Sequence, residues 1–229
     1  MPSESAIRNA AASRFELIET LRWQPDSGFV RLERHLARLA ASARELGFVF
    51  DAHRIENALQ SAVDPAAAKR VRLVLAPDGQ AQCTTSIFNP LAPGTIWRLA
   101  LAVTKLDETD PLLAHKTTRR APYEAARAEF TPEETDEVIL TNRGGELCEG
   151  TITNLFVDMG DGRLLTPALA CGLLPGVLRA ELIDTGRAAE AVLDETMLAA
   201  ARKLYVGNSL RGLIPAVLVE SQAVIPGDA

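Results

Sequence analysis

The stretch FELIETLRWQPDSGFVRLERHLARLAASARELGF, residues 15–48, contains both kinds of secondary structure on which the fold depends. Its first part, residues 15–23, is rich in large apolar side chains and predicts a strand. A Pro-Asp-Ser-Gly segment follows at residues 25–28, which is typical of a turn. Apolar side chains then recur at spacings of three and four, which predicts an amphipathic helix over residues 29–48. The chain therefore combines a strand and a helix within this one stretch.

Strand-like and helix-like segments continue to mix along the rest of the chain. Residues 51–63 predict a second helix, and residues 69–88 predict a hairpin around a Pro-Asp-Gly turn. Further strands are expected at 95–106, within 136–167 (three short ones) and at 203–220, and further helices at 120–130, 173–186 and 194–201. This mixture favours a two-part α/β (α+β) architecture over a doubly wound parallel sheet.

The expected division of the chain has three parts. Residues 1–106 form an N-terminal α/β domain, residues 107–115 form the connection, and residues 116–229 form the C-terminal domain. No apolar run reaches about 18 residues, so no membrane span is expected. The first residues contain no signal-peptide core either.

The bulk composition narrows the classes of function. The 229 residues are 47% hydrophobic and 24% charged, which is typical of soluble proteins. The net charge of −6 argues against a nucleic-acid partner. Three widely spaced cysteines without a CxxC pair suggest neither a disulfide framework nor a metal site, and they favour a reducing cytoplasm. Neither GxGxxG nor GxxxxGK[ST] is present, so no common nucleotide-binding fingerprint is found.

Lys116 is the first candidate for chemistry. It lies in LLAHKTTRRAPYEAAR, residues 112–127, after an apolar Leu-Leu pair and before Arg119 and Arg120. Burial and neighbouring cations lower the pKa of a lysine and allow it to form a Schiff base. A solvated surface lysine is the alternative interpretation.

Glu149 is the second candidate. It lies in ELCEGTITNLF, where alternating polar and apolar residues predict a half-buried strand with Glu149, Thr151 and Thr153 on one face. A carboxylate in that position can pair with the pyridinium nitrogen of a bound cofactor and keep its ring electron-poor. A solvated glutamate on an edge strand is the alternative.

Two further segments are suited to bind an anion. In CGLLPGVLR, residues 171–179, a Leu-Pro-Gly sequence begins a helix, and the free N–H groups of Val177 and Leu178 suit a phosphate. In RHLARL, Arg38 presents a planar guanidinium with several donors. An ordinary helix start and a solvated helix arginine are the alternatives.

The order of these features resembles that of the class IV pyridoxal-phosphate-dependent aminotransferase family. Arg38, Lys116, Glu149, the Leu-Pro-Gly sequence and a Gly-Asn-Ser loop at 207–209 follow one another as they do in that family. The most specific segments are HLARL, EGTITNLF and LLPGVLR, and the resemblance extends from about residue 15 to residue 217. The family includes branched-chain and D-amino acid aminotransferases and 4-amino-4-deoxychorismate lyase.

The resemblance implies a small α/β domain, a barrel-like second domain and pyridoxal 5'-phosphate between them. It also implies a small anionic amino substrate and a homodimer. Lys116 would hold the cofactor covalently and move the Cα proton, and Glu149 would pair with the ring nitrogen. The phosphate would be held by Arg38, the amides of Val177 and Leu178, the Ser209 hydroxyl and the adjacent Asn208.

Within the family, FELIETLRW, HLARLAASARELGF and HKTTRRAPYEAAR look most like the lyase module that some bacteria fuse to aminodeoxychorismate synthase. That lyase converts 4-amino-4-deoxychorismate to 4-aminobenzoate and pyruvate in folate biosynthesis. Thr20 matches a threonine that assists protonation of the leaving enol, although it also suits a strand as a β-branched residue. Arg120 and Arg211 are candidates to bind an anionic substrate.

Two other functions remain open at this point. One is an aminotransferase acting on branched-chain or D-amino acids, and the other is a cofactor-binding protein without turnover. Tyr123 either bonds the phenolic oxygen of the cofactor or only packs. The chain also lacks the D-R-G…G-D-G stretch that longer relatives have before their F-E-T-like motif, which affects the substrate assignment more than the cofactor assignment.

Overall fold

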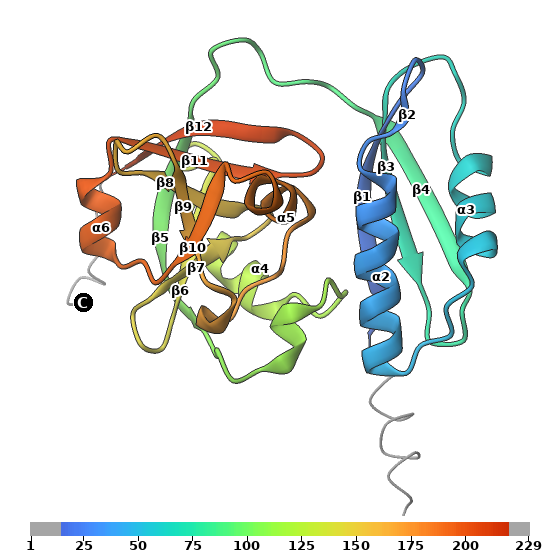
Figure 1. Ribbon diagram of the computed structural model, residues 1–229, viewed down its shortest axis with the longest axis horizontal. Coiled ribbons are helices and arrows are strands. Elements are labelled where there is room, and N and C mark those ends of the chain that lie inside the picture. Colours follow the sequence, from blue (N-terminus) through green and yellow to red (C-terminus); the bar gives the residue numbers. More distant parts are fainter. Residues whose placement is uncertain (1–14, 220–229) are drawn as a thin grey trace, which may run out of the picture.

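The computed structural model describes residues 15–219, which form two β-sheets with helices packed around them (Figure 1). The smaller sheet has the strand order β2-β1-β3-β4, and all its pairings are antiparallel. Its strands are Gly28–Phe29 (β2), Leu17–Gln24 (β1), Lys69–Leu75 (β3) and Ala81–Ile87 (β4). The predicted first strand and the predicted hairpin at 69–88 are both confirmed.

Helices α2 (Leu32–Leu46) and α3 (Ala52–Ser61) pack their apolar faces onto this sheet. The core between them contains side chains that recur at helical spacing on the helices and at alternate positions on the strands. These include Leu39, Ala43, Ile55, Leu59, Leu17, Leu21, Val71 and Leu73. Burying each large aliphatic side chain stabilises the fold by about 1.5–3 kcal/mol. This core fixes the position of α2 against β1.

The larger sheet has the strand order β10-β9-β8-β11-β12-β5-β6-β7. Its strands are Ala188–Ala191 (β10), Leu164–Pro167 (β9), Asn154–Asp158 (β8), Lys203–Asn208 (β11), Gly212–Leu218 (β12), Trp97–Leu106 (β5), Glu137–Asn142 (β6) and Leu147–Gly150 (β7). An additional pairing of β7 with β8 closes six of these strands into a barrel-like ring. The predicted two-part α/β fold with a barrel-like second part is therefore confirmed.

Three helices pack around the larger sheet: α4 (Ala121–Ala128), α5 (Val177–Asp184) and α6 (Glu195–Ala200). Short 3₁₀ turns occur at Pro111–Ala114 and Leu169–Cys171. Over the described range 15–219, none of the helices has the length and apolar character needed to cross a bilayer.

The predicted division of the chain at residues 107–115 differs from the observed sheets. β5 was expected in the N-terminal domain, but it pairs in parallel with β6 and β12 of the larger sheet. The chain thus passes from one sheet to the other between Ile87 and Trp97. The apolar pattern of β5 predicts a buried strand in either sheet, and only its pairing partners decide which one it joins.

Two other strand predictions need correction. Residues 136–167 contain four strands rather than three, because a bend at residues 151–153 separates β7 from β8. β10 was not predicted. Its sequence AAEA has little strand propensity, and the strand forms by parallel pairing with β9.

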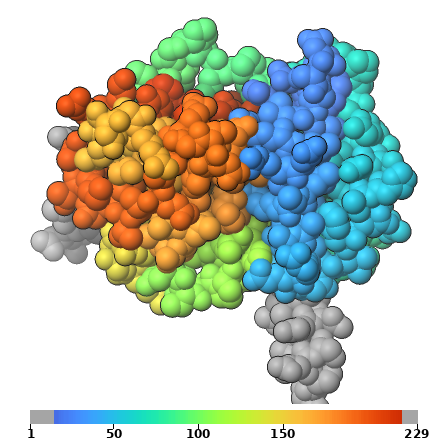
Figure 2. Space-filling model, in the orientation of Figure 1, coloured from blue at the N-terminus to red at the C-terminus, as the bar shows by residue number. Residues whose placement is uncertain are grey.

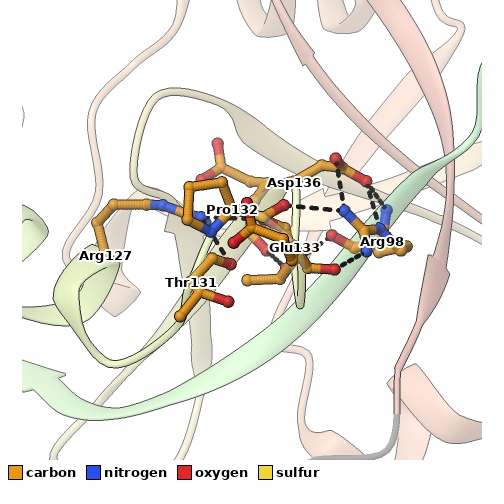
Figure 3. Close-up of polar contacts among 8 residues, drawn as sticks. Arg98, Arg127, Thr131, Pro132, Glu133 and Asp136 are labelled. Atoms are coloured by element: carbon orange, nitrogen blue, oxygen red, sulfur yellow. Dashed lines mark hydrogen bonds and ion pairs between the residues drawn. The ribbon is translucent and has the colours of Figure 1, made fainter.

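An arginine-centred network holds the loop between α4 and β6 (Figure 3). The Arg98 side chain bonds both carboxylate oxygens of Asp136, at 3.0 and 3.1 Å, and also donates to the carbonyls of Pro132 and Glu133. Arg127 of α4 donates to the Thr135 carbonyl at 2.9 Å. The network fixes α4 relative to the larger sheet.

The two parts of the molecule meet along β1 and α2 (Figures 1 and 2). The backbone N–H of Ile18 donates to the carbonyl of Lys116 at 2.8 Å, and Leu17 forms an antiparallel bridge with Thr117. On the other side, Arg31 pairs with Glu181 at 2.6 Å. The segment that contains Lys116 is thus attached to the edge of the smaller sheet.

Candidate active site

A cavity of about 320 Å³ lies where the two parts meet, and residues from both parts line it. The predicted site residues among its lining are Thr20, Arg38, Lys116, Arg120, Glu149, Val177, Asn208, Ser209 and Arg211. Residues more than 180 positions apart in the sequence thus come together at one place.

Leu178 is the predicted site residue that does not line the cavity. Its side chain packs into a core cluster with Phe156. The prediction concerned its backbone N–H, which belongs to the first turn of α5 and has no intrahelical acceptor there.

Lys116 is partly buried and faces the cavity, and across residues 15–219 its Nζ has no hydrogen-bond partner. Burial, followed by the positive charge of Arg38, lowers the pKa of this amine to about 8. The carboxylates of Glu19 and Glu149 act in the opposite direction but do not cancel the effect. About a tenth of the amine is therefore neutral at pH 7, far more than for a lysine with the ordinary pKa of 10.5, and a neutral amine is a nucleophile.

Glu149 is a buried carboxylate whose hydrogen-bond donors in the described part of the chain are all neutral. Its Oε1 accepts from the Tyr123 hydroxyl at 2.8 Å and from the Leu174 N–H at 3.0 Å. Among residues 15–219, its Oε2 has only the side-chain amide of Asn154 as a hydrogen-bond donor, at 3.4 Å. Burial raises the pKa of Glu149 to about 7, although these hydrogen bonds oppose the shift. This oxygen can accept a hydrogen bond from a cation placed in the cavity.

Tyr123 has a role that neither sequence interpretation anticipated. Its hydroxyl donates to Glu149, and the Arg120 guanidinium lies over its ring at 4.8 Å from the centroid. Burial and the nearby Glu149 carboxylate raise the pKa of the Tyr123 hydroxyl, which keeps it protonated as a donor. Tyr123 thus orients the carboxylate.

The bend at residues 151–153 replaces the expected continuous strand, so Glu149, Thr151 and Thr153 do not share one strand face. The buried Glu137 carboxylate organises this bend. It accepts from both the N–H and the hydroxyl of Thr151, at 3.0 and 2.6 Å, from the Ile152 N–H at 3.1 Å, and from the Thr153 hydroxyl at 2.8 Å. Carbonyls of the same bend then bind Arg120 and Asn208.

The start of α5 requires a glycine. A Cβ at Gly176 would lie 1.8 Å from Oδ1 of Asn154, which is far inside van der Waals contact. Gly176 is the N-cap residue and provides no side-chain cap for the helix. The first-turn N–H groups therefore remain available beside Val177, which lines the cavity. The predicted helix start after the Pro-Gly pair is confirmed.

A buried network connects Arg38 and Ser209. The Arg38 guanidinium binds both carboxylate oxygens of Glu19, at 2.8 and 2.6 Å, and donates to the Pro175 carbonyl at 3.2 Å. His35 bonds Glu19 at 2.7 Å through Nδ1 and the Ser209 hydroxyl at 2.8 Å through Nε2. Burial alone would raise the pKa of Glu19, but Arg38 and His35 outweigh it and hold the pKa at about 2.

The loop after β11 is held by its own side chains. Asn208 donates to the Ile152 carbonyl at 3.2 Å and accepts from the Arg211 N–H at 3.0 Å, so its amide is engaged within the loop. Arg211 reaches the Asn89 carbonyl at 3.4 Å, and its guanidinium lies 5.9 Å from the Phe88 ring centroid. Asn208 therefore orders the loop that presents Ser209.

Sequence reasoning missed Glu19, His35 and Glu137. A local signal existed for Glu19, because it occupies the inward-facing series Leu17–Leu21 of β1, where a carboxylate needs a partner. His35 precedes Leu39 by one helical turn and so shares its buried face. Glu137 gave no such signal, since its partners other than the Val138 N–H follow 14 to 16 residues later.

Comparison with known proteins assigns the family. The model of the family "Amino-transferase class IV" matches residues 16–219, so the chain belongs to the class IV aminotransferase family. Enzymes of this family use pyridoxal phosphate, and the predicted enzyme class and cofactor are confirmed at this level.

Individual relatives carry different names. The crystal structure of a "Putative amino-acid aminotransferase" from Mesorhizobium loti is 57% identical, with a TM-score of 0.88, over 90% of this chain and 100% of that one. The "Putative aminodeoxychorismate lyase" of Schizosaccharomyces pombe is 29% identical over 85% of this chain and 86% of its own length. The "Probable branched-chain-amino-acid aminotransferase" of Thermotoga maritima is 27% identical over 86% of this chain and 74% of its own length.

The residues present fit pyridoxal phosphate. Glu149 is a buried carboxylate with one weakly bonded oxygen, as a pyridinium partner requires. The Lys116 amine faces the same cavity. The uncapped start of α5, with Arg38 and Ser209 beside it, provides donors for a phosphate. The donor set thus matches both the charged ring nitrogen and the phosphate group.

Proposed function

We propose that this chain is a pyridoxal-phosphate-dependent lyase that converts 4-amino-4-deoxychorismate to 4-aminobenzoate and pyruvate. The observation that carries this proposal is that Thr20 lines the same cavity as Lys116. A lyase of this kind needs a proton donor for the leaving enol in addition to the amine. The name of the Schizosaccharomyces pombe relative supports the same reaction.

In this proposal Lys116 binds the cofactor covalently, and Glu149 pairs with its ring nitrogen. The phosphate is held by Arg38, Ser209 and the first-turn amides of Val177 and Leu178. Asn208 orders the loop that carries Ser209. When bound, pyridoxal phosphate supplies the electron sink that stabilises negative charge at the carbon next to the amine.

The chain's own residues then move two protons. The Lys116 amine, once the amino group of the substrate has displaced it from the cofactor, would take the proton from the ring carbon that bears this amino group. The C–O bond to the pyruvate part breaks, and the ring becomes aromatic. The Thr20 hydroxyl donates a proton to the methylene carbon of the leaving enolate, which becomes pyruvate. The proton taken by Lys116 passes to solvent, and Thr20 recovers one from solvent. General acid–base steps of this kind contribute about 10²–10⁴ in rate.

The charge around the cavity suits an anionic substrate. Arginines from three separate segments line it, namely Arg70, Arg119, Arg120 and Arg211. The substrate has two carboxyl-bearing parts, and planar guanidinium groups bind carboxylates with good geometry. Arg120 and Arg211 remain the proposed substrate ligands, and Arg70 joins them from β3.

An aminotransferase is the second candidate. The Mesorhizobium loti protein, which is 57% identical and fully covered by the match, is named "Putative amino-acid aminotransferase", and this name favours transfer of an amino group. Such a reaction uses Lys116 and Glu149 in the same roles but does not require the Thr20 hydroxyl.

Products separate the two candidates. We expect the enzyme to release pyruvate from 4-amino-4-deoxychorismate, measured by coupling to lactate dehydrogenase. Thr20→Val keeps the shape of the side chain and removes the hydroxyl, so pyruvate release should fall by about 10²-fold. Thr85→Val, at an exposed strand threonine, is the control. Transfer from an amino acid to 2-oxoglutarate without pyruvate release would instead identify an aminotransferase.

Two further parts of the proposal concern the oligomeric state of the enzyme and its location in the cell. A homodimer is expected from the family resemblance, and sedimentation of the purified protein tests it. The cytoplasmic location expected from the cysteine content stays a prediction.

A further inference from the structure

The contact between His35 and Ser209 joins the two parts of the molecule at the cavity. His35 comes from α2, and Ser209 comes from the loop after β11, 174 positions away. The His35 and Glu19 side chains are each only about 2% exposed. Arg31, also at the start of α2, donates to the Ser209 carbonyl at 3.3 Å. Both the hydroxyl and the carbonyl of Ser209 are therefore held from the N-terminal part.

The chemistry of the three groups fixes their roles. Glu19 is ionised, because its pKa lies near 2. An ionised carboxylate only accepts hydrogen bonds, so the His35 Nδ1 that faces it carries a proton. Nε2 then meets the Ser209 hydroxyl at 2.8 Å. For the single Ser209 proton to reach a phosphate oxygen, Nε2–H must donate to Oγ. A serine hydroxyl rotates freely when it has no partner, and this contact restricts Oγ to one position.

The same carboxylate also holds Arg38. Both Glu19 oxygens bind the Arg38 guanidinium, which limits it to one orientation beside the carbonyl of Pro175. Glu19 thus connects the two side chains that the proposed function assigns to the phosphate, one directly and one through His35. An ionic group with two hydrogen-bonded partners is a rigid support for its neighbours.

We infer that Glu19 and His35 are positioning residues for the phosphate subsite, because they orient Arg38 and the Ser209 hydroxyl for a phosphate monoester. The inference rests on the proposed cofactor site. His35 acts through Ser209, so the phosphate subsite is complete only when α2 is packed against the loop after β11. The ring and the covalent attachment at Lys116 do not depend on His35.

A comparison of pyridoxal phosphate with pyridoxal, which lacks the phosphate, tests this inference. Binding to the purified apo protein is followed by the visible absorption of the lysine-bound aldehyde. We expect His35→Leu to weaken pyridoxal phosphate binding by about tenfold, the size of one lost hydrogen bond. Pyridoxal binding should remain unchanged. His35→Gln, which keeps a hydrogen-bonding group, should recover part of the affinity.

A double-mutant cycle with Ser209→Ala shows whether His35 affects pyridoxal phosphate binding through Ser209. If His35 acts through Ser209, His35→Leu has no further effect on pyridoxal phosphate binding in the Ser209→Ala background. His53→Leu is the control, because His53 is exposed on α3. Should His35→Leu fail to fold, His35→Gln provides the same cycle, with thermal unfolding confirming the fold of each variant.

Two results would overturn the inference. One is an equal loss of affinity for pyridoxal and pyridoxal phosphate in the His35 variants. The other is an undiminished effect of His35→Leu in the Ser209→Ala background. A wild-type protein that binds neither aldehyde would contradict the proposed function itself, and that outcome is distinct because it appears before any variant is made.

Discussion

Two buried glutamates beside the same cavity differ in their partners. Glu19 is 1% exposed and meets the guanidinium of Arg38 and the ring of His35. Glu149 is 4% exposed and meets a phenol, a backbone amide and a side-chain amide. The pKa of Glu19 is held at about 2, whereas that of Glu149 is raised to about 7. Similar burial therefore gives opposite shifts.

The difference shows how burial can serve structure in one place and chemistry in another. A buried charge with a cationic partner is stable, and removing the partner is costly. A buried carboxylate with neutral donors keeps unfavourable electrostatic energy until a cation arrives. Glu19 is therefore an ion that holds Arg38 and His35 in place, whereas Glu149 is prepared for a charged ligand.

Glu137 is a third case. Its carboxylate is 1% exposed and receives several hydrogen bonds from the bend at residues 151–153. It has neither a salt-bridged partner in the described part of the chain nor a place among the residues that line the cavity. It shapes the wall of the site without facing a ligand.

The largest expected effect is at Lys116, whose amine faces the same cavity as Glu149. Lys116→Ala should abolish covalent cofactor attachment and lower turnover by on the order of 10⁴-fold. The visible absorption band and the product assay measure the two effects. Lys105→Ala, on β5, is a matched control. A variant that still shows the band would place the reactive lysine elsewhere.

The comparison predicts opposite effects on stability when each glutamate is neutralised. The pKa of Glu19 is below its ordinary value of 4.5, so its ionisation stabilises the fold above about pH 4.5, and this contribution is lost as the pH falls toward 2. Glu19→Gln should therefore lower the free energy of unfolding of the apo protein by about 3–5 kcal/mol at pH 8.

The pKa of Glu149 is above 4.5, so its ionisation costs stability as the pH rises through about 7. The wild-type apo protein should lose roughly 3 kcal/mol between about pH 5 and pH 8 from this group. Glu149→Gln should remove that dependence. Urea unfolding at about pH 5 and pH 8 measures the free energy of unfolding of Glu19→Gln and Glu149→Gln. Equal destabilisation by the two substitutions would contradict the predicted difference between the two glutamates.

Turnover measurements test the chemical role of Glu149, the second glutamate of this comparison. Glu149→Gln should lower turnover by on the order of 10²-fold, because a neutral amide cannot stabilise a protonated ring nitrogen. The cofactor should stay attached, since Lys116 and the phosphate donors are unchanged. Activity assays with absorbance as the loading control check this. Unchanged activity would remove Glu149 from the ring-nitrogen role.

Glu137→Gln tests whether the Glu137 carboxylate, which accepts hydrogen bonds from neutral donors of the bend, has a structural role. The amide has one acceptor oxygen in place of two, so at least one donor of the bend loses its partner. We expect a loss of about 1–3 kcal/mol in stability and a rise in KM, because Arg120 is held by the Thr151 carbonyl. Glu56→Gln, at an exposed helix position, provides the control.

The smallest expected effect is the pH dependence of Lys116. Because its pKa is lowered to about 8, the neutral fraction of the amine should fall about tenfold per pH unit below 8. The rate at which the apo protein attaches pyridoxal should follow that fraction. A midpoint near the ordinary lysine value of 10.5 would show that burial does not shift this amine.

Part of the site could be predicted because its signals are local. Lys116, Glu149, Arg38 and the Pro-Gly helix start lie in short segments whose order along the chain resembles one family. Residues without a local signal were found only in three dimensions. Glu137 looks like an ordinary strand residue until the bend at 151–153 folds over it.

The sequence by itself determined the strand and helix of residues 15–48, the hairpin at 69–88 and the family to which the chain belongs. These depend on side-chain periodicity, turn residues and motif order, which are properties of neighbouring positions. The tertiary structure alone decided that β5 joins the larger sheet, that His35 meets Ser209, and that Glu19 rather than Glu149 receives the cation. The physical reason is that sheet membership, burial and charge pairing depend on groups that are distant in the chain and adjacent only after folding.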